Sequence, residues 1–205
     1  MTADCSDNDQ PSADDALARL MEGNQRFISG HTEVPTLEKE LLLEQAKGQQ
    51  PYATILGCSD SRVPPELIFD AWLGELFVIR VAGNVLGQSI LGTLQYAARY
   101  LHTPLFVVMG HEGCGAVEAA VNYQFEGSRH PNKIEFLLDN IAPAFGDLDE
   151  TAPRAELLKA AVEANVRRTV QALRDSPEGQ SQMEHGVKLI GAIYALHTGR
   201  VRFLE

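Results

Sequence analysis

The sequence predicts a single α/β domain built on a mostly parallel sheet. Short, mostly apolar, β-branched runs alternate with stretches of helical periodicity, and the run over 105–109 is apolar along its whole length. Strands that alternate with helices pair in parallel, and continuously apolar strands indicate a sheet covered on both faces. The 205 residues suit one medium domain. We expect a central four-stranded parallel sheet with an antiparallel edge strand, helices on both faces and an N-terminal helical arm.

The sequence of the first fifth of the chain predicts a tail followed by helices. Residues 1–13 are polar and acidic, so we expect a disordered acidic tail and a domain over residues 14–205. Apolar residues recur at three- and four-residue spacing over 14–29, which indicates an amphipathic helix. A second short helix is expected over 36–47.

The remaining elements follow from the alternation of patterns. Residues 125–152 contain two prolines and an acidic turn and are the least regular part. The short turn at Gly199 implies that the last strand is antiparallel to its predecessor. We expect strands over 52–56, 76–81, 105–109, 187–196 and 201–204, and helices over 64–69, 88–101, 116–123 and 155–173.

Composition excludes several classes of function. The formal net charge of −11 disfavours nucleic acid and anionic membrane surfaces as partners. No apolar run approaches the roughly 20 residues that span a bilayer. The N-terminus lacks the basic and apolar regions of a secretory signal, which favours a cytoplasmic protein. Three cysteines are too few for a disulfide framework, so Cys58 and Cys114 are interpreted as metal ligands or reactive thiols.

Two short segments place soft metal ligands at the ends of expected strands. Cys58 follows the strand over 52–56, and His111 and Cys114 follow the strand over 105–109. The carboxyl ends of parallel strands are where ligands bind in such sheets. Two thiols and one imidazole would hold a zinc ion and leave its fourth position open, as in catalytic zinc sites. The other five histidines lack a partner ligand at useful spacing.

A charged pair accompanies the first ligand. Asp60 and Arg62 lie two residues apart, directly after Cys58. Residues at this spacing in an extended loop point the same way. An exposed salt bridge alone would contribute little stability, but the position beside a metal ligand favours a role in the site.

These residues carry a resemblance to a known family. Cys58-x-Asp60-x-Arg62 followed by His111-x-x-Cys114-Gly115 resembles the β-class carbonic anhydrases. The resemblance covers roughly the whole chain after the tail. Further matching segments are Gly23-Asn24-Gln25-Arg26-Phe27, Ser61-Arg62-Val63-Pro64, Gly74-Glu75-Leu76-Phe77-Val78-Ile79-Arg80 and Gly83-Asn84.

The resemblance implies a zinc lyase that interconverts carbon dioxide and bicarbonate by attack of zinc-bound hydroxide. One Zn²⁺ per chain would be held by Cys58, His111 and Cys114. Asp60, paired with Arg62, would orient the hydroxide. The residues matching the family's substrate-binding positions are Gln49, Phe77, Tyr96 and Gly115.

The resemblance also bears on assembly and on the resting state. It implies a homodimer or larger homo-oligomer, in which the N-terminal helix wraps a neighbouring subunit and Gln49 reaches the crevice at the subunit boundary. The alternative is that this helix packs on its own sheet. A subgroup with a bicarbonate-inhibited resting state carries Trp where this chain has Ile55, so we expect Asp60 to stay paired with Arg62.

Other functions remain open from the sequence. A related zinc hydrolase acting on carbon disulfide or carbonyl sulfide would use the same attack on a linear triatomic molecule. A non-catalytic zinc protein is disfavoured by the presence of Asp60 and Arg62. A thiol redox protein is disfavoured by the lack of a Cys-x-x-Cys motif.

Overall fold

The computed structural model describes residues 10–33, 42–43 and 45–204. Residues 36–41 and 44 of the expected helix over 36–47, and residues 1–9 of the expected disordered tail over 1–13, lie outside the described residues. The described end of that helix agrees with the prediction, because Leu42, Leu43 and Gln45 are helical and the Ala46 N–H donates to the Leu42 carbonyl oxygen at 3.0 Å. The end of the expected tail is described: Ser12 caps the first helix, and its hydroxyl oxygen accepts a hydrogen bond from the Asp15 backbone N–H at 3.1 Å. No described helix is long and apolar enough to cross a membrane.

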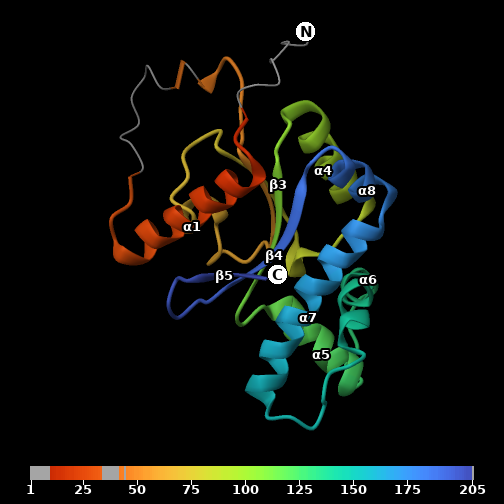
Figure 1. Cartoon of the computed structure of the whole chain (residues 1–205). Helices are drawn as coiled ribbons and strands as arrows, with labels where there is room; N and C mark the ends of the chain where they lie inside the picture. The colour runs from red at the N-terminus through yellow and green to blue at the C-terminus, as the bar shows by residue number, and fades with distance from the viewer. Residues whose placement is uncertain (1–9, 34–41, 44, 205) are drawn as a thin grey trace.

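The sheet has the predicted architecture (Figure 1). Its strand order is β2-β1-β3-β4-β5, with four parallel strands and an antiparallel β5 at one edge. Because β2 and β3 flank β1 on opposite sides, the strand order reverses at β1 and the loops after β1 and β3 open toward one crevice. The strands are β1 Ala53–Gly57, β2 Leu76–Arg80, β3 Leu105–His111, β4 Lys188–Tyr194 and β5 Val201–Leu204.

Most helices occur where the periodicity predicts them. They are α1 Ala13–Ser29, α3 Pro65–Ile68, η1 Ala82–Asn84, α4 Gln88–Leu101, α5 Gly115–Phe125, α6 Asn132–Ile141, η2 Ala142–Phe145, α7 Arg154–Asp175 and α8 Pro177–Glu184.

The expectation of an irregular stretch over 125–152 is wrong in its centre. There α6 buries Leu138 and Ile141, and η2 follows it directly. Pro131 stands immediately before α6 and Pro143 lies in the first turn of η2. Proline has no backbone N–H. It is tolerated at both places, because an N–H at the start of a helix would have no intrahelical acceptor. The helix α8 is a further element that the sequence reasoning did not identify.

One face of the sheet is covered by α7, which approaches the backbone closely (Figure 1). A Cβ atom at Gly110 of β3 would lie 2.5 Å from Val166, and one at Gly191 of β4 would lie 2.8 Å from the same side chain. Real Cβ atoms do not approach other atoms so closely, so larger residues would push α7 away. The two glycines therefore set the position of α7 over β4 and over β3, the strand that ends at His111.

The opposite face is covered by α1, which packs on its own chain (Figure 1). Ala16 and Leu20 are fully buried, and a Cβ atom at Gly23 would lie 1.9 Å from the carbonyl oxygen of Phe69. The buried side of α1 therefore packs on its own chain, as in the alternative given above in which this helix covers its own sheet.

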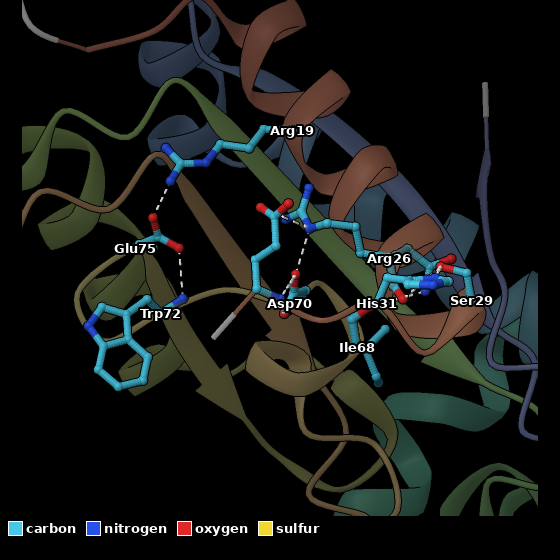
Figure 2. Close-up of polar contacts among 10 residues, drawn as sticks. Arg19, Arg26, Ser29, His31, Ile68, Asp70, Trp72 and Glu75 are labelled. Carbon is cyan, nitrogen blue, oxygen red and sulfur yellow. Dashed lines mark hydrogen bonds and ion pairs between the residues drawn. The ribbon is translucent and has the colours of Figure 1, made fainter. Parts of the chain in front are cut away.

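Charged contacts fix α1 to the segment between α3 and β2 (Figure 2). Arg26 Nε donates to Asp70 Oδ2 at 2.6 Å, and the Asp70 carboxylate is fully buried. Hydrogen bonding to Asp70 raises the pKa of Arg26. Arg19 pairs with Glu75, whose second oxygen accepts from the Trp72 backbone N–H at 2.7 Å.

Candidate metal centre

The switch point brings the three predicted metal ligands together. Cys58 is the first residue after β1, His111 is the last residue of β3, and Cys114 caps the N-terminus of α5. Their ligand atoms all lie within 4.8 Å of one another. Among the residues the structure describes, they form the single group of three or more His, Cys, Asp or Glu side chains with this spacing.

The cluster is buried and has dimensions that suit a metal ion. The exposed fractions of Cys58, His111 and Cys114 are 4%, 1% and 3%. The two Sγ atoms lie 3.9 Å apart. Tetrahedral coordination with Zn–S bonds of about 2.3 Å places two sulfurs roughly 3.8 Å apart.

His111 is oriented by the loop that follows it. The backbone carbonyl oxygen of Glu112 lies 2.9 Å from His111 Nδ1 and accepts a hydrogen bond from it. This hydrogen bond leaves Nε2 as the unprotonated nitrogen, and Nε2 is buried without a hydrogen-bond partner in the described part of the chain. A buried acceptor without a partner is costly, and a histidine whose other nitrogen binds a carbonyl is the usual arrangement of a metal ligand.

The two thiols share one hydrogen bond and titrate in opposite directions. Donation from Cys114 lowers the pKa of Cys58, and the same hydrogen bond, with burial, raises the pKa of Cys114. Backbone N–H groups of Gly83 and Asp60 also lower the pKa of Cys58. At Cys114, N–H groups in the first turn of α5, from Ala116 and Val117, favour the thiolate. Both sulfurs thus have N–H donors that would stabilise two thiolates around a cation.

Asp60 is held beside the cluster by a two-pronged interaction with Arg62. Arg62 Nε donates to Oδ1 at 2.9 Å and Nη2 donates to Oδ2 at 2.6 Å. The Arg62 backbone N–H donates to Oδ1 at 3.0 Å. These bonds hold the pKa of Asp60 well below its usual range. Oδ2 lies 3.9 Å from His111 Nε2, so an ionised carboxylate stands next to the ligand cluster, in the pairing that Ile55 predicts.

Two residues that the sequence reasoning did not assign hold the loop after β1. Arg80, at the end of β2, donates from Nε to the Cys58 carbonyl oxygen at 2.9 Å and from Nη2 to the Asp60 carbonyl oxygen. The signal in the sequence is a lone cation at the end of an apolar strand. Asn165, buried in α7, donates to the Gly83 carbonyl oxygen at 2.8 Å. No local pattern indicates a role for Asn165, because its partner is 82 residues away.

The four expected substrate-binding residues fall into two groups. Gly115 is exposed and starts α5 directly after Cys114, next to the cluster. Phe77 pairs in register with Thr54, and Gln49 is exposed four residues before β1, so both lie toward the end of β1 opposite to Cys58. Tyr96 on α4 stacks on Phe77 at 6.1 Å between ring centroids. A single chain therefore does not bring Gln49, Phe77 and Tyr96 to the metal cluster.

The donor set is that of a zinc site. Two thiolates and one imidazole favour zinc over magnesium or calcium, which prefer oxygen ligands. The orphaned Nε2 of His111, the sulfur separation and the N–H donors to both sulfurs all fit a bound cation. The fold and the cluster together define an α/β protein with a three-residue candidate metal site at the switch point of its sheet.

Comparison with known proteins identifies the family. The carbonic anhydrase family model matches residues 53–201. The chain is 35% identical over 187 residues to carbonic anhydrase 2 of Mycobacterium tuberculosis, covering 90% of this chain and 89% of that protein. It is 39% identical over 139 residues to a carbonic anhydrase of Mycolicibacterium smegmatis, covering 67% and 66%.

Solved structures agree with the sequence matches. The β-carbonic anhydrase CafA of Aspergillus fumigatus aligns with a TM-score of 0.74 and 28% identity, covering 94% of this chain and 90% of that one. The chain therefore belongs to the carbonic anhydrase family, in its β-class, and is an enzyme of that family.

Proposed function

We propose that the protein catalyses the reversible hydration of carbon dioxide to bicarbonate with one zinc ion held by Cys58, His111 and Cys114. The observation that carries the proposal is the buried ligand cluster with the Asp60 carboxylate fixed 3.9 Å from His111 Nε2. Family membership supports the reaction. A zinc ion held here would supply a Lewis acid that lowers the pKa of a water molecule and makes it a nucleophile for carbon dioxide.

The side chains around the cluster would orient that water and the hydroxide formed from it. Asp60 is ionised and has one face occupied by Arg62, which leaves its Oδ2 as the acceptor on the side of His111. Arg62 is itself fixed, since Nη2 also donates to the Gly113 carbonyl oxygen at 3.2 Å. Arg80 holds the backbone on both sides of this acceptor. Asp60 is thus proposed to accept a hydrogen bond from the nucleophile and so orient it, and Arg62 to position Asp60.

Stopped-flow measurement of carbon dioxide hydration on metal-analysed protein tests the proposal. We expect one zinc per chain and a rate that rises with pH above neutrality. The same preparation is assayed with carbonyl sulfide and carbon disulfide, because the alternative hydrolase would prefer these substrates. A zinc-loaded protein that does not hydrate carbon dioxide would exclude the proposed reaction.

We further propose that a neighbouring subunit completes the site. Gln49, Phe77 and Tyr96 match substrate-binding positions, but within one chain they lie toward the far end of β1 from the cluster. Tyr96 is 47% exposed and Tyr100 beside it is 63% exposed. The strand β2 carries Phe77, and within the described part of the chain it is an edge strand with no strand paired on its outer side. A second copy placed against this aromatic edge could supply the missing side chains and cover the apolar surface.

Subunit complementation tests the shared site. Cys58→Ser should remove the metal site of its own chain, and Gln49→Ala should remove only the side chain given to a neighbour. Coexpression should restore activity in mixed oligomers, since one site then has both an intact cluster and an intact Gln49. The control is a mixture of the separately purified homo-oligomers without subunit exchange. A monomeric wild-type protein with full activity, measured by light scattering, would contradict the shared site.

A further inference from the structure

A cavity separate from the metal cluster lies at the carboxyl ends of β3 and β4. Its volume of about 580 Å³ is in the range of small-molecule sites. None of the three candidate metal ligands lines it, and neither Asp60 nor Arg62 does. Its apolar wall comes from the first turns of α7 and the end of β4, and consists of Ala155, Leu158, Val162, Ile193 and Ala195.

The rim of this cavity is cationic. Lys159 and Arg200 are both exposed, and neither forms an ion pair with any residue in the described ranges. Arg202 also lines the cavity, and its Nη2 donates to Glu163 at 2.6 Å. A carboxylate on the lining, that of Glu112, faces His197 at 3.5 Å. A chain with a net charge of −11 therefore carries a small positive surface here, with two cations available to an anion.

The start of α7 borders the cavity, and its first turn also carries the acidic residue Glu156, which does not line the cavity. Its N-cap residue is Pro153, which offers no side-chain hydrogen bond to the first turn. The N-terminus of a helix carries a partial positive charge from N–H groups without intrahelical acceptors. Ala155 and Leu158, in the first two turns, belong to the cavity lining, so the apolar wall begins where this charge is greatest.

We propose that this cavity binds a small amphipathic carboxylate, such as a medium-chain fatty acid or an aryl carboxylate. The apolar body would lie against Leu158, Val162 and Ile193, and the carboxylate would accept hydrogen bonds from Arg200 and Lys159 at the rim. A small inorganic anion would leave the apolar wall wet, and a neutral apolar molecule would leave both cations without partners. The combination of wall and rim thus selects a molecule with one charged end.

The position of the cavity connects it to the metal centre. Glu112 and Gly113 belong to its lining, and these two residues hold the site side chains through their carbonyl oxygens. Glu112 accepts from His111 Nδ1 at 2.9 Å, and Gly113 accepts from Arg62 Nη2 at 3.2 Å. A bound carboxylate would therefore contact the backbone that orients a metal ligand and the partner of Asp60.

Isothermal titration of octanoate into the full-length, zinc-loaded protein tests the proposal. We expect saturable binding with one molecule per chain. Arg200→Gln should weaken binding about tenfold, which is the loss expected for one charge-assisted hydrogen bond. Ala155→Trp should fill the cavity and abolish binding. Arg168→Gln is the matched control, because Arg168 is an exposed arginine of α7 outside this cavity.

Further measurements separate this site from the metal and from a subunit contact. Each titration is repeated with saturating azide, which would occupy the open position on the metal, and with acetate, which lacks the apolar body. Octanoate binding should persist with azide, and acetate should bind much more weakly. Binding that azide displaces and Ala155→Trp leaves intact would assign the carboxylate to the metal. Absent binding, or an oligomeric state changed by Ala155→Trp, would assign the cavity to another occupant; either result overturns the proposal.

Discussion

Asn24 on α1 hydrogen-bonds the backbone of Val201 at the start of β5, 177 residues further along the chain. The Val201 N–H donates to Asn24 Oδ1 at 2.9 Å, and Asn24 Nδ2 donates to the carbonyl oxygens of Gly199 at 2.8 Å and Ile68 at 3.1 Å. The amide is buried and uses both ends. One side chain therefore joins α1, the end of α3 and the β4–β5 turn.

Replacing Asn24 should destabilise the fold strongly. Asn24→Ala removes three hydrogen bonds and leaves buried backbone groups without partners, so we expect the free energy of unfolding to fall by about 2–4 kcal/mol. Urea unfolding at neutral pH measures the change. The control is Asn140→Ala, which removes a hydrogen bond on the exposed side of α6 and should cost less than about 0.5 kcal/mol. Equal effects of the two substitutions would show that α1 is not fixed through this amide.

Removing one thiol should abolish metal binding. Cys58→Ser leaves two of the three protein ligands and replaces a soft thiolate by a hydroxyl, so we expect zinc below about one tenth of an equivalent after dialysis. Elemental analysis of purified protein measures the content. Cys5→Ser is the control, because Cys5 belongs to neither ligand loop, and it should keep one zinc per chain. Stoichiometric zinc in Cys58→Ser would exclude Cys58 as a ligand.

Neutralising Asp60 should separate activity from metal content. An amide is a weaker hydrogen-bond acceptor than a carboxylate, and its NH₂ group would oppose one of the donors of Arg62. We expect Asp60→Asn to keep its zinc and to lose about 100-fold in kcat, the upper end of the effect of removing an outer-shell partner of a metal site. Asp149→Asn changes an exposed aspartate that caps a turn and should leave kcat unchanged. Near-normal turnover in zinc-loaded Asp60→Asn would remove Asp60 from the mechanism.

Activity and stability should depend on pH in different ranges. Two thiolates neutralise the charge of Zn²⁺, so the metal is a weaker Lewis acid than one with three neutral ligands, and activity should rise above neutral pH. The pKa of Asp60 is depressed by Arg62, so its contribution to stability is present above the unfolded pKa of about 4 and is lost as pH falls through the folded value. Rate profiles and acid unfolding curves measure the two effects. A rate profile that falls from pH 7 to 9 would contradict the first.

Local patterns predicted the sheet and the three residues of the candidate metal cluster, whereas contacts between segments far apart in the chain could not be predicted from them. The alternation of apolar strands and helices is a property of neighbouring residues, and so is the spacing of His111 and Cys114. The bonds of Arg80 and Asn165 to the ligand loops depend on packing between segments far apart in the chain. The helix α6 was not predicted, because a proline usually indicates the absence of a helix. Pro131, however, stands just before α6 and does not interrupt it. Resemblance supplied Gln49, Phe77 and Tyr96, whose use of a second subunit stays a prediction.

The burial of the three ligand side chains also has a consequence for how fast metal enters and leaves. Cys58, His111 and Cys114 are each at most 4% exposed, and they are set by two loops that Arg80 and the first turn of α5 hold in place. The open fourth position admits one small ligand, but a multidentate chelator cannot replace the three protein ligands until a loop opens. The rate of zinc loss should therefore become independent of chelator concentration and should equal the rate of loop opening. The rate of metal exchange would then measure the rate of local opening at the switch point of the sheet.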